Sequence, residues 1–296
     1  MKAYHLPRRP VLLLLTLTLC VPAWTAAQQI PSPEQFFGHQ MGADRQLARW
    51  DKLVEYYDMI GGRSDRVQFV PMGPSTLGNP FLSIFVSSPE NLANLDEIKR
   101  MNAILQDPRG HSEAEVDNAI ENSKVVFVQS YGLHSTEVAA SQSAAEIMYD
   151  FATRNDDGIN EILDNTVSIL IPAFNPDGNI IVTDWYNRWV GTEYEGSGPP
   201  ELYHHFIGHD NNRDAFMQAT IESWYGAEIL FREWVPQAYI DHHQMGPYTA
   251  RIYLPPYAEP IRPGGDPLVW REMTWYGAHM AYKMDEAELD GAIDFR

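Results

Sequence analysis

The stretch Gln129-Ser-Tyr-Gly-Leu-His-Ser-Thr-Glu-Val-Ala-Ala-Ser141 lies between two segments of different character. Residues 124–129 contain the run Val-Val-Phe-Val, which is typical of a buried strand. Residues 138–151 are rich in alanine and carry apolar residues at helical spacing, so we expect a helix that begins near residues 134–137. A strand followed by a turn and a helix places the turn at the carboxyl edge of an open α/β sheet, where such folds bind ligands.

Two residues of this turn, His134 and Glu137, could bind one metal ion. They are three positions apart, so on a single helical turn their side chains would reach the same point. A His-x-x-Glu pair also arises by chance, and a lone histidine here could equally be a core or capping residue. The pair alone therefore predicts a metal site only if a further ligand joins it.

The end of another predicted strand offers that ligand. Catalytic zinc sites use three nitrogen or oxygen ligands and keep one position open for water. The predicted strand at residues 238–241 leads directly into His242 and His243. Neighbouring side chains of a strand point to opposite faces, so we expect at most one of the two to be a ligand. The alternative is a strand end with one buried and one exposed histidine.

The composition indicates one large acidic domain. The 296 residues carry a formal net charge of −19, which excludes nucleic acid and anionic membrane surfaces as expected partners. After the N-terminal region, no apolar run approaches the length of a membrane span, so we expect none.

The N-terminus has the pattern of an export signal. Basic residues are followed by the apolar run 11–21 and by small residues at 25–27, which predicts a signal peptide over residues 1–27 and an extracellular or periplasmic protein. Cys20, the single cysteine, lies inside it, so the exported chain would have no disulfide; a lipid-anchor motif there is disfavoured because Leu19 is not small. We interpret residues 28–43 as a linker and residues 44–296 as the catalytic domain.

The remaining elements alternate between strand and helix patterns, which predicts an α/β fold with a mixed, largely parallel sheet flanked by helices. Residues 186–209 lack periodicity and are interpreted as a long functional loop; their histidines, His204, His205 and His209, are assigned to that loop rather than to a second metal site. The other predicted elements are helices at 44–60, 89–105, 113–122, 215–234 and 270–283, strands at 67–71, 81–87, 167–172 and 250–254, and a turn at 174–178.

Five motifs together resemble the zinc metallocarboxypeptidases of the carboxypeptidase A type, over residues 44–254. Their order along the chain is the order in that family, which makes the set far more specific than any one motif. The motifs are Gly73-Pro-Ser-Thr-Leu-Gly-Asn-Pro80, Gly132-Leu-His-Ser-Thr-Glu137, Asn175-Pro-Asp-Gly178, Gly208-His-Asp-Asn-Asn-Arg213 and Asp241-His-His243.

The resemblance implies a carboxypeptidase-like fold and a role for each matching residue. His134, Glu137 and His243 would bind one Zn²⁺ per chain. Asn212 and Arg213 would hold the free C-terminal carboxylate of a peptide substrate, a task suited to a guanidinium beside an amide. Arg188 stands near the position of the family's arginine that polarises the scissile carbonyl. The implied activity is hydrolysis of C-terminal residues from peptides.

The chain also departs from the family pattern. Thr136 stands where many members have arginine, and Ala215 where many have an aromatic residue. The family's general-base glutamate lies farther beyond the third zinc ligand than the residues remaining after His243, so we expect the base beyond Arg296 and interpret the chain as truncated. Two alternatives remain open: a related amidase or deacylase of the same fold, and a non-catalytic zinc-containing peptide-binding module.

Overall fold

The computed structural model describes residues 29–209, 211–246, 250, 252–256 and 265–289, with the backbone of 292–294. The predicted signal peptide lies outside the described residues. The helices are α1 (Pro33–Phe37), α2 (Trp50–Gly61), α3 (Pro89–Ala93), α4 (Leu95–Gln106), α5 (Glu113–Asn122), α6 (Ala139–Thr153), α7 (Asp157–Asn165), α8 (Pro176–Trp189), α9 (Asp214–Met217), α10 (Ile221–Ala227) and α11 (Pro267–Glu286). The strands are β1 (Val67–Pro74), β2 (Pro80–Val86), β3 (Val125–Tyr131), β4 (Thr166–Ile171), β5 (Ala238–His242), β6 (Ile252–Leu254) and β7 (Ala292–Asp294).

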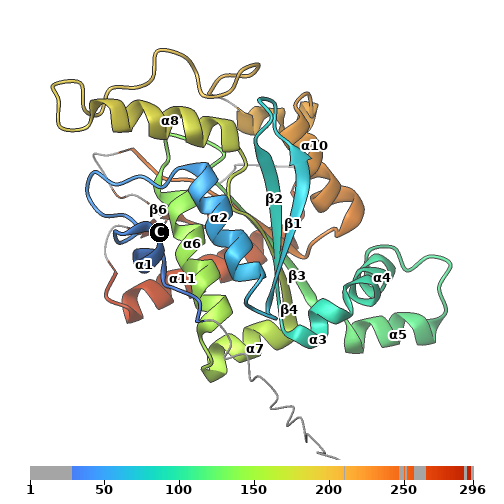
Figure 1. The fold of residues 1–296 in the computed structure, drawn as a ribbon. Helices are drawn as coiled ribbons and strands as arrows, with labels where there is room; N and C mark the ends of the chain where they lie inside the picture. The colour runs from blue at the N-terminus through green and yellow to red at the C-terminus, as the bar shows by residue number, and fades with distance from the viewer. Residues whose placement is uncertain are drawn as a thin grey trace, which may run out of the picture.

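A mixed five-stranded sheet forms the centre of the molecule, as predicted (Figure 1). Its order is β1-β2-β4-β3-β5; β3 is parallel to both β4 and β5, whereas β2 is antiparallel to β1 and β4. Parallel β3 and β5 end at the same edge, so the loops that follow them lie side by side. A separate two-stranded parallel sheet pairs β6 with β7.

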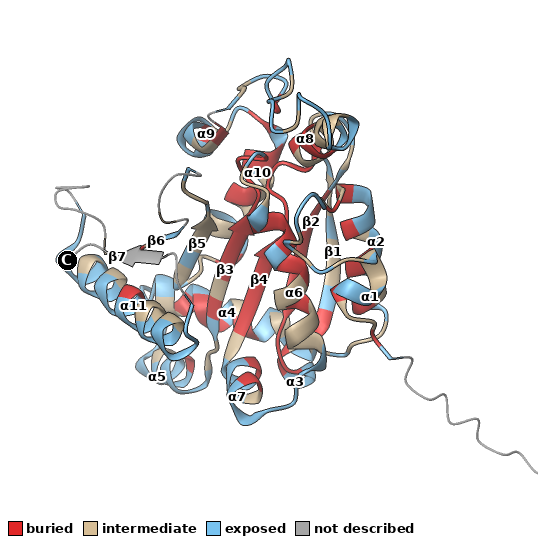
Figure 2. Cartoon of the chain, turned by 90° about the vertical axis from the view of Figure 1, so that its left-hand side faces the viewer, coloured by how far each residue is buried: buried red, intermediate tan, exposed pale blue. Residues whose placement is uncertain are grey.

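The three central strands β2, β4 and β3 are mostly buried, whereas the edge strands β1 and β5 are only partly buried (Figure 2). On one face, Leu53 and Tyr57 of α2 pack with Ala144 and Met148 of α6. On the other face, the apolar residues of β3 and β4 pack with residues that follow α10, including Trp234. Within the Val-Val-Phe-Val run of β3, Val126 and Val128 are buried in this second face, whereas Val125 is exposed and Phe127 is partly buried.

Several predicted boundaries were wrong. The helix predicted from residue 44 begins at Trp50, because Arg45 has φ +62° and interrupts any helix there. The turn predicted at 174–178 is a helix start: Asn175 caps α8 by accepting a hydrogen bond from the Gly178 N–H at 2.8 Å. Helix α8 then continues to Trp189, so residues 186–189 do not belong to a loop.

Two long predicted helices are each divided. The segment 89–105 breaks at Asn94, which ends α3 and begins α4. The segment 215–234 breaks at Gln218, whose φ is +52°, and restarts at α10, followed by the π-helix η2 (Glu228–Glu233). Within the predicted linker, α1 forms and its Phe36 and Phe37 pack against the core. The pattern analysis did not identify α7.

A buried carboxylate joins the turn between β1 and β2 to the start of α8. Asp177 is 2% exposed and accepts hydrogen bonds from the Leu77 N–H at 2.8 Å, from Asn79 Nδ2 at 2.7 Å and from the Ser75 hydroxyl. Among the described residues no other acceptor is in place for these donors, so losing the carboxylate leaves them unsatisfied.

We expect Asp177→Ala to lower the free energy of unfolding by about 3 kcal/mol, measured by urea denaturation. The exposed Asp117 in α5 provides the matched control, for which Asp117→Ala should change stability by less than about 0.5 kcal/mol. Equal effects of the two substitutions would show that the buried carboxylate does not organise this turn.

Candidate metal centre

His134 and Glu137 lie in the turn between β3 and α6. The Glu137 N–H donates to the His134 carbonyl at 2.9 Å, and α6 begins only at Ala139, so the expectation that both residues lie on one helical turn was wrong. The chain leaves β3 through Gly132, which has φ +60°; a Cβ there would meet the Ser141 hydroxyl at 2.1 Å. This backbone conformation turns the chain before a helix can start.

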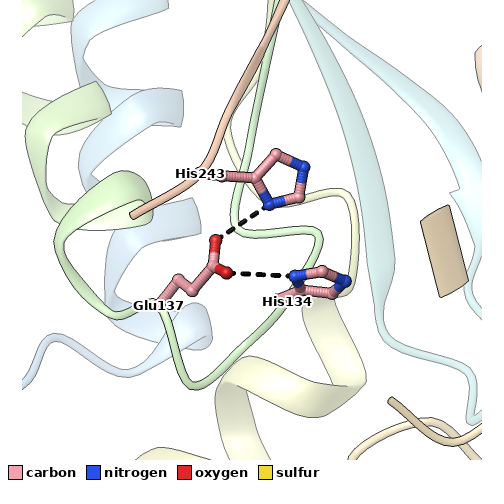
Figure 3. A group of neighbouring side chains, drawn as sticks. All are labelled: His134, Glu137 and His243. Carbon is pink, nitrogen blue, oxygen red and sulfur yellow. Dashed lines mark hydrogen bonds and ion pairs between the residues drawn. The ribbon is translucent and has the colours of Figure 1, made fainter. Parts of the chain in front are cut away.

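Three side chains converge at this turn (Figure 3). They are His134, Glu137 and His243, and together they form the group that could bind a metal ion. Glu137 Oε1 lies 3.0 Å from His134 Nδ1, and Glu137 Oε2 lies 2.9 Å from His243 Nδ1. The three potential ligand atoms all lie within 4.8 Å of one another. Two imidazole nitrogens and a carboxylate facing one point form a donor set suited to Zn²⁺.

Strand pairing explains why His243 reaches a turn more than a hundred residues earlier. β5 pairs in parallel with β3, and Tyr131 stands opposite His242. His242 turns to the opposite side, where its ring stacks on Tyr131 with centroids 4.3 Å apart and its Nε2 lies 3.3 Å from Gln129 Oε1. Of the two adjacent histidines, the structure therefore brings only His243 to the group.

Hydrogen bonds from residues around the group orient the side chains of His243 and Glu137. His243 Nε2 lies 2.8 Å from Asp241 Oδ2, and the Ser130 hydroxyl donates to Asp241 Oδ1 at 2.6 Å. The Gln244 N–H donates to Glu137 Oε2 at 3.0 Å. A carboxylate on the far nitrogen of a histidine fixes its tautomer and leaves the near nitrogen for a metal.

The protonation states follow from these contacts. Burial raises the pKa of Glu137, but its hydrogen bonds with His134, His243 and the Gln244 N–H outweigh this and lower the pKa to about 2. The hydrogen bonds of His243 with Asp241 and Glu137 raise the pKa of His243 to about 10. Burial lowers the pKa of His242 to about 4. His243 is thus protonated and forms ion pairs with the carboxylates of Glu137 and Asp241.

We therefore expect zinc binding to release one proton at neutral pH. His243 is protonated below its raised pKa, and zinc needs its Nδ1 free, so affinity should fall roughly tenfold for each pH unit lowered. Calorimetry in two buffers of different ionisation enthalpy measures the released proton. Identical heats in both buffers would contradict this protonation state.

Of the two predicted carboxylate-binding residues, only Asn212 lines a cavity together with residues next to the group. Asn212 and Arg213 belong to the short 3₁₀ turn η1 (Asn211–Arg213), and Asn211 Nδ2 donates to the Leu133 carbonyl at 2.7 Å. Asn212, together with Leu133 and Asp241, lines a largely apolar cavity of about 390 Å³. Arg213 is exposed.

Arg188 is not brought to the group. It lies exposed in the last turn of α8, and among the described residues none forms a hydrogen bond or ion pair with it. The start of α8 lies near the group, because the Ser135 hydroxyl donates to the carbonyl of its cap, Asn175. Arg188 lies about 20 Å farther along the helix axis.

His209, which was assigned only to a loop, contacts a predicted ligand. Its ring stacks on that of His134 with centroids 4.5 Å apart, and its Nδ1 lies 2.5 Å from the Tyr203 hydroxyl. The only sequence signal was its place within the Asn-Arg motif. His209 adds a further polar side chain to the edge of the group.

Comparisons with known proteins identify a family and a fold. The model of a family described as zinc carboxypeptidase matches residues 53–234. No curated protein matches the sequence.

Solved structures share the fold. Thrombin-activatable fibrinolysis inhibitor superposes with a TM-score of 0.51 at 14% identity, over 90% of this chain and 61% of its own. Carboxypeptidase A from Helicoverpa armigera superposes with a TM-score of 0.54 at 14% identity, over 88% of this chain and 62% of its own. The chain thus spans about six tenths of the length of these structures.

Proposed function

The chain belongs to the zinc carboxypeptidase family, and we propose that it acts as a zinc-dependent hydrolase that removes C-terminal residues from peptides. One observation carries this proposal: His134 Nδ1, His243 Nδ1 and the Glu137 carboxylate face a common point at the carboxyl edge of the sheet. The donor set fits zinc, and the partial exposure of His243 leaves this point accessible to a substrate.

Each residue has a defined task in this proposal. A bound zinc ion would polarise the scissile carbonyl and lower the pKa of a water molecule. His134, Glu137 and His243 would hold the ion, and Asp241 would keep His243 in the required tautomer. Asn212 and Arg213 would bind the terminal carboxylate of the peptide.

The cavity beside Asn212 would receive the side chain of the C-terminal residue. Its walls include Leu133, Phe174, Leu230 and Phe231, and it offers mostly apolar surface. A large apolar side chain gains most from such a pocket because it leaves water there.

A second candidate is peptide binding without turnover. Among the described residues, Glu137 is the one glutamate in the group, and there it would serve as a ligand. No second glutamate is therefore assigned as general base. Loss of a general base costs a factor on the order of 10²–10⁴ in rate, while the metal and the carboxylate-binding residues could still hold a peptide end.

Zinc content and peptide cleavage test the two candidates together. We expect about one zinc per chain, and release of the last residue from N-blocked dipeptides with a free carboxylate but not from their amides. Zinc with peptide affinity but no cleavage would favour the binding module. Cleavage of the amides with equal efficiency would favour an amidase or deacylase.

Export remains a proposal. None of the helices in the described part of the chain is long and apolar enough to cross a bilayer. Fractionation of the native host, with N-terminal sequencing of the protein, tests whether it is exported and begins at Gln28.

A further inference from the structure

A chain of hydrogen bonds leads from the wall of the cavity beside Asn212 to the metal group. Tyr239 and Asp241 are two positions apart on β5, so their side chains lie on the same face of the sheet, and both line that cavity. Ser130 of β3 pairs with Asp241 across the parallel strands. The Tyr239 hydroxyl lies 2.8 Å from Ser130 Oγ, and Ser130 Oγ lies 2.6 Å from Asp241 Oδ1. Asp241 Oδ2 continues the chain to His243 Nε2 at 2.8 Å.

The direction of these hydrogen bonds follows from the donors available. The Asp241 carboxylate, which is ion-paired with His243, only accepts, so the single hydroxyl proton of Ser130 is used on Asp241. The Ser130 oxygen is then left as an acceptor, which makes Tyr239 the donor in their contact. Burial raises the pKa of Tyr239, so its hydroxyl keeps this proton at neutral pH. Each oxygen of Asp241 thus receives a donor, Ser130 on one side and His243 on the other.

The Asp241 carboxylate depends on this support because it borders a cavity. Its side chain is 21% exposed and lines the cavity beside Asn212, so the carboxylate has room to turn away from His243. Ser130, in contrast, is fully buried, and the pairing of β3 with β5 fixes its position. The Ser130 hydroxyl therefore holds the carboxylate in the orientation in which it can accept from His243.

The ring and the hydroxyl of Tyr239 serve different surroundings. The residue is 40% exposed and its ring contributes to the cavity wall, whereas its hydroxyl is in contact with the buried Ser130. Among the described residues, Ser130 is the one hydrogen-bond partner of this hydroxyl. A phenyl ring would preserve the wall, so the hydroxyl contributes chiefly through Ser130.

We propose that Tyr239 and Ser130 are positioning residues for the metal group, which hold Asp241 on His243 and thereby increase the affinity for zinc. The inference rests on the proposed function and deepens it by adding two residues that act behind Asp241. It also gives Tyr239 two tasks, because its ring lines the substrate cavity and its hydroxyl supports the metal group.

Zinc affinity, measured by competition against a chromophoric chelator, tests the positioning role. Loss of a contact to a metal ligand costs 10–100-fold in affinity, and Ser130 acts one step farther out, so Ser130→Ala should weaken zinc binding about tenfold. Tyr239→Phe removes only the outermost hydroxyl and should weaken it about threefold. Because the Tyr239 hydroxyl acts through Ser130, the double variant should bind zinc no more weakly than Ser130→Ala alone.

Tyr225→Phe is the matched control. The Tyr225 hydroxyl donates to the Pro74 carbonyl at 3.1 Å, so this substitution also deletes one hydrogen bond of a tyrosine, but away from the metal group. It should leave zinc affinity unchanged.

NMR of the zinc-loaded chain gives a second readout, which a general loss of stability would not change. The proton on His243 Nε2 lies in the hydrogen bond to Asp241, and a weaker hydrogen bond moves such a proton upfield. We expect an upfield shift in Ser130→Ala and in Tyr239→Phe, and none in the Tyr225→Phe control.

Unchanged zinc affinity and an unmoved proton in Ser130→Ala, or a double variant in which the two losses multiply, would overturn the positioning role and leave the proposed function intact. A parent chain that binds no zinc would overturn the proposed function and this inference together.

Discussion

Replacing Glu137 with glutamine is expected to reduce bound zinc from about one ion per chain to less than about one tenth, with a loss of affinity greater than 100-fold. The reason is that both carboxylate oxygens are engaged: Oε1 faces His134 and Oε2 faces His243. An amide offers one neutral oxygen and turns an N–H towards one of the two histidines. Removing a contact to a ligand already costs 10–100-fold in affinity, and removing the ligand itself should cost more.

The adjacent histidines provide a matched control. His243→Phe should remove zinc as fully as Glu137→Gln, whereas His242→Phe should keep it, because His242 stacks on Tyr131 and a phenyl ring preserves that contact. Metal content after dialysis, with competition against a chromophoric chelator, gives both the stoichiometry and the affinity. Equal zinc loss in the two phenylalanine variants would place the third ligand elsewhere.

Replacing Arg213 with alanine is expected to remove the preference for a free C-terminal carboxylate. In the zinc-loaded parent chain, a peptide acid should bind about 10–100-fold more tightly than its amide, because a hydrogen bond to a charged group contributes about 1.5–3 kcal/mol. The variant should bind the acid and the amide nearly alike and should retain its zinc, since Arg213 is not among the three ligands.

Arg232→Ala controls for the loss of one positive charge. Arg232 is an exposed arginine that pairs with Glu228 at 3.4 Å, and its removal should leave the ratio between acid and amide unchanged. If Arg213→Ala kept the full preference, the carboxylate would be held by another group and the amidase alternative would gain support.

Much of the fold was predictable because it depends on local patterns. The Val-Val-Phe-Val run is rich in β-branched residues and forms β3, and the Ser112 capping box marks the start of α5 through contacts made within the segment. Errors occurred where one residue overrides a pattern. Arg45 and Gln218 adopt φ values that no periodicity reveals, and the start of α8 depends on the cap made by Asn175.

The candidate site was predictable in its residues but not in its conformation. Spacing selected His134 and Glu137, and the resemblance to a family selected His243 as the third ligand. The parallel pairing of β3 with β5 explains why the three residues meet. The sequence pattern placed His134 and Glu137 on a helix because the alanine-rich helical periodicity begins directly after Glu137. It could not foresee that His209 stacks on His134, because that contact depends on how the 203–209 segment folds back.

X-ray absorption spectroscopy of the zinc-loaded chain tests the central claim most directly. The predicted result is a zinc ion with nitrogen and oxygen neighbours at about 2.0–2.2 Å, including the outer-shell scattering of two imidazole rings. His243→Phe, if it retained any metal, should show one ring only. A spectrum with no imidazole scattering, or one unchanged in the Glu137→Gln variant, would contradict the assignment of this turn as the metal centre.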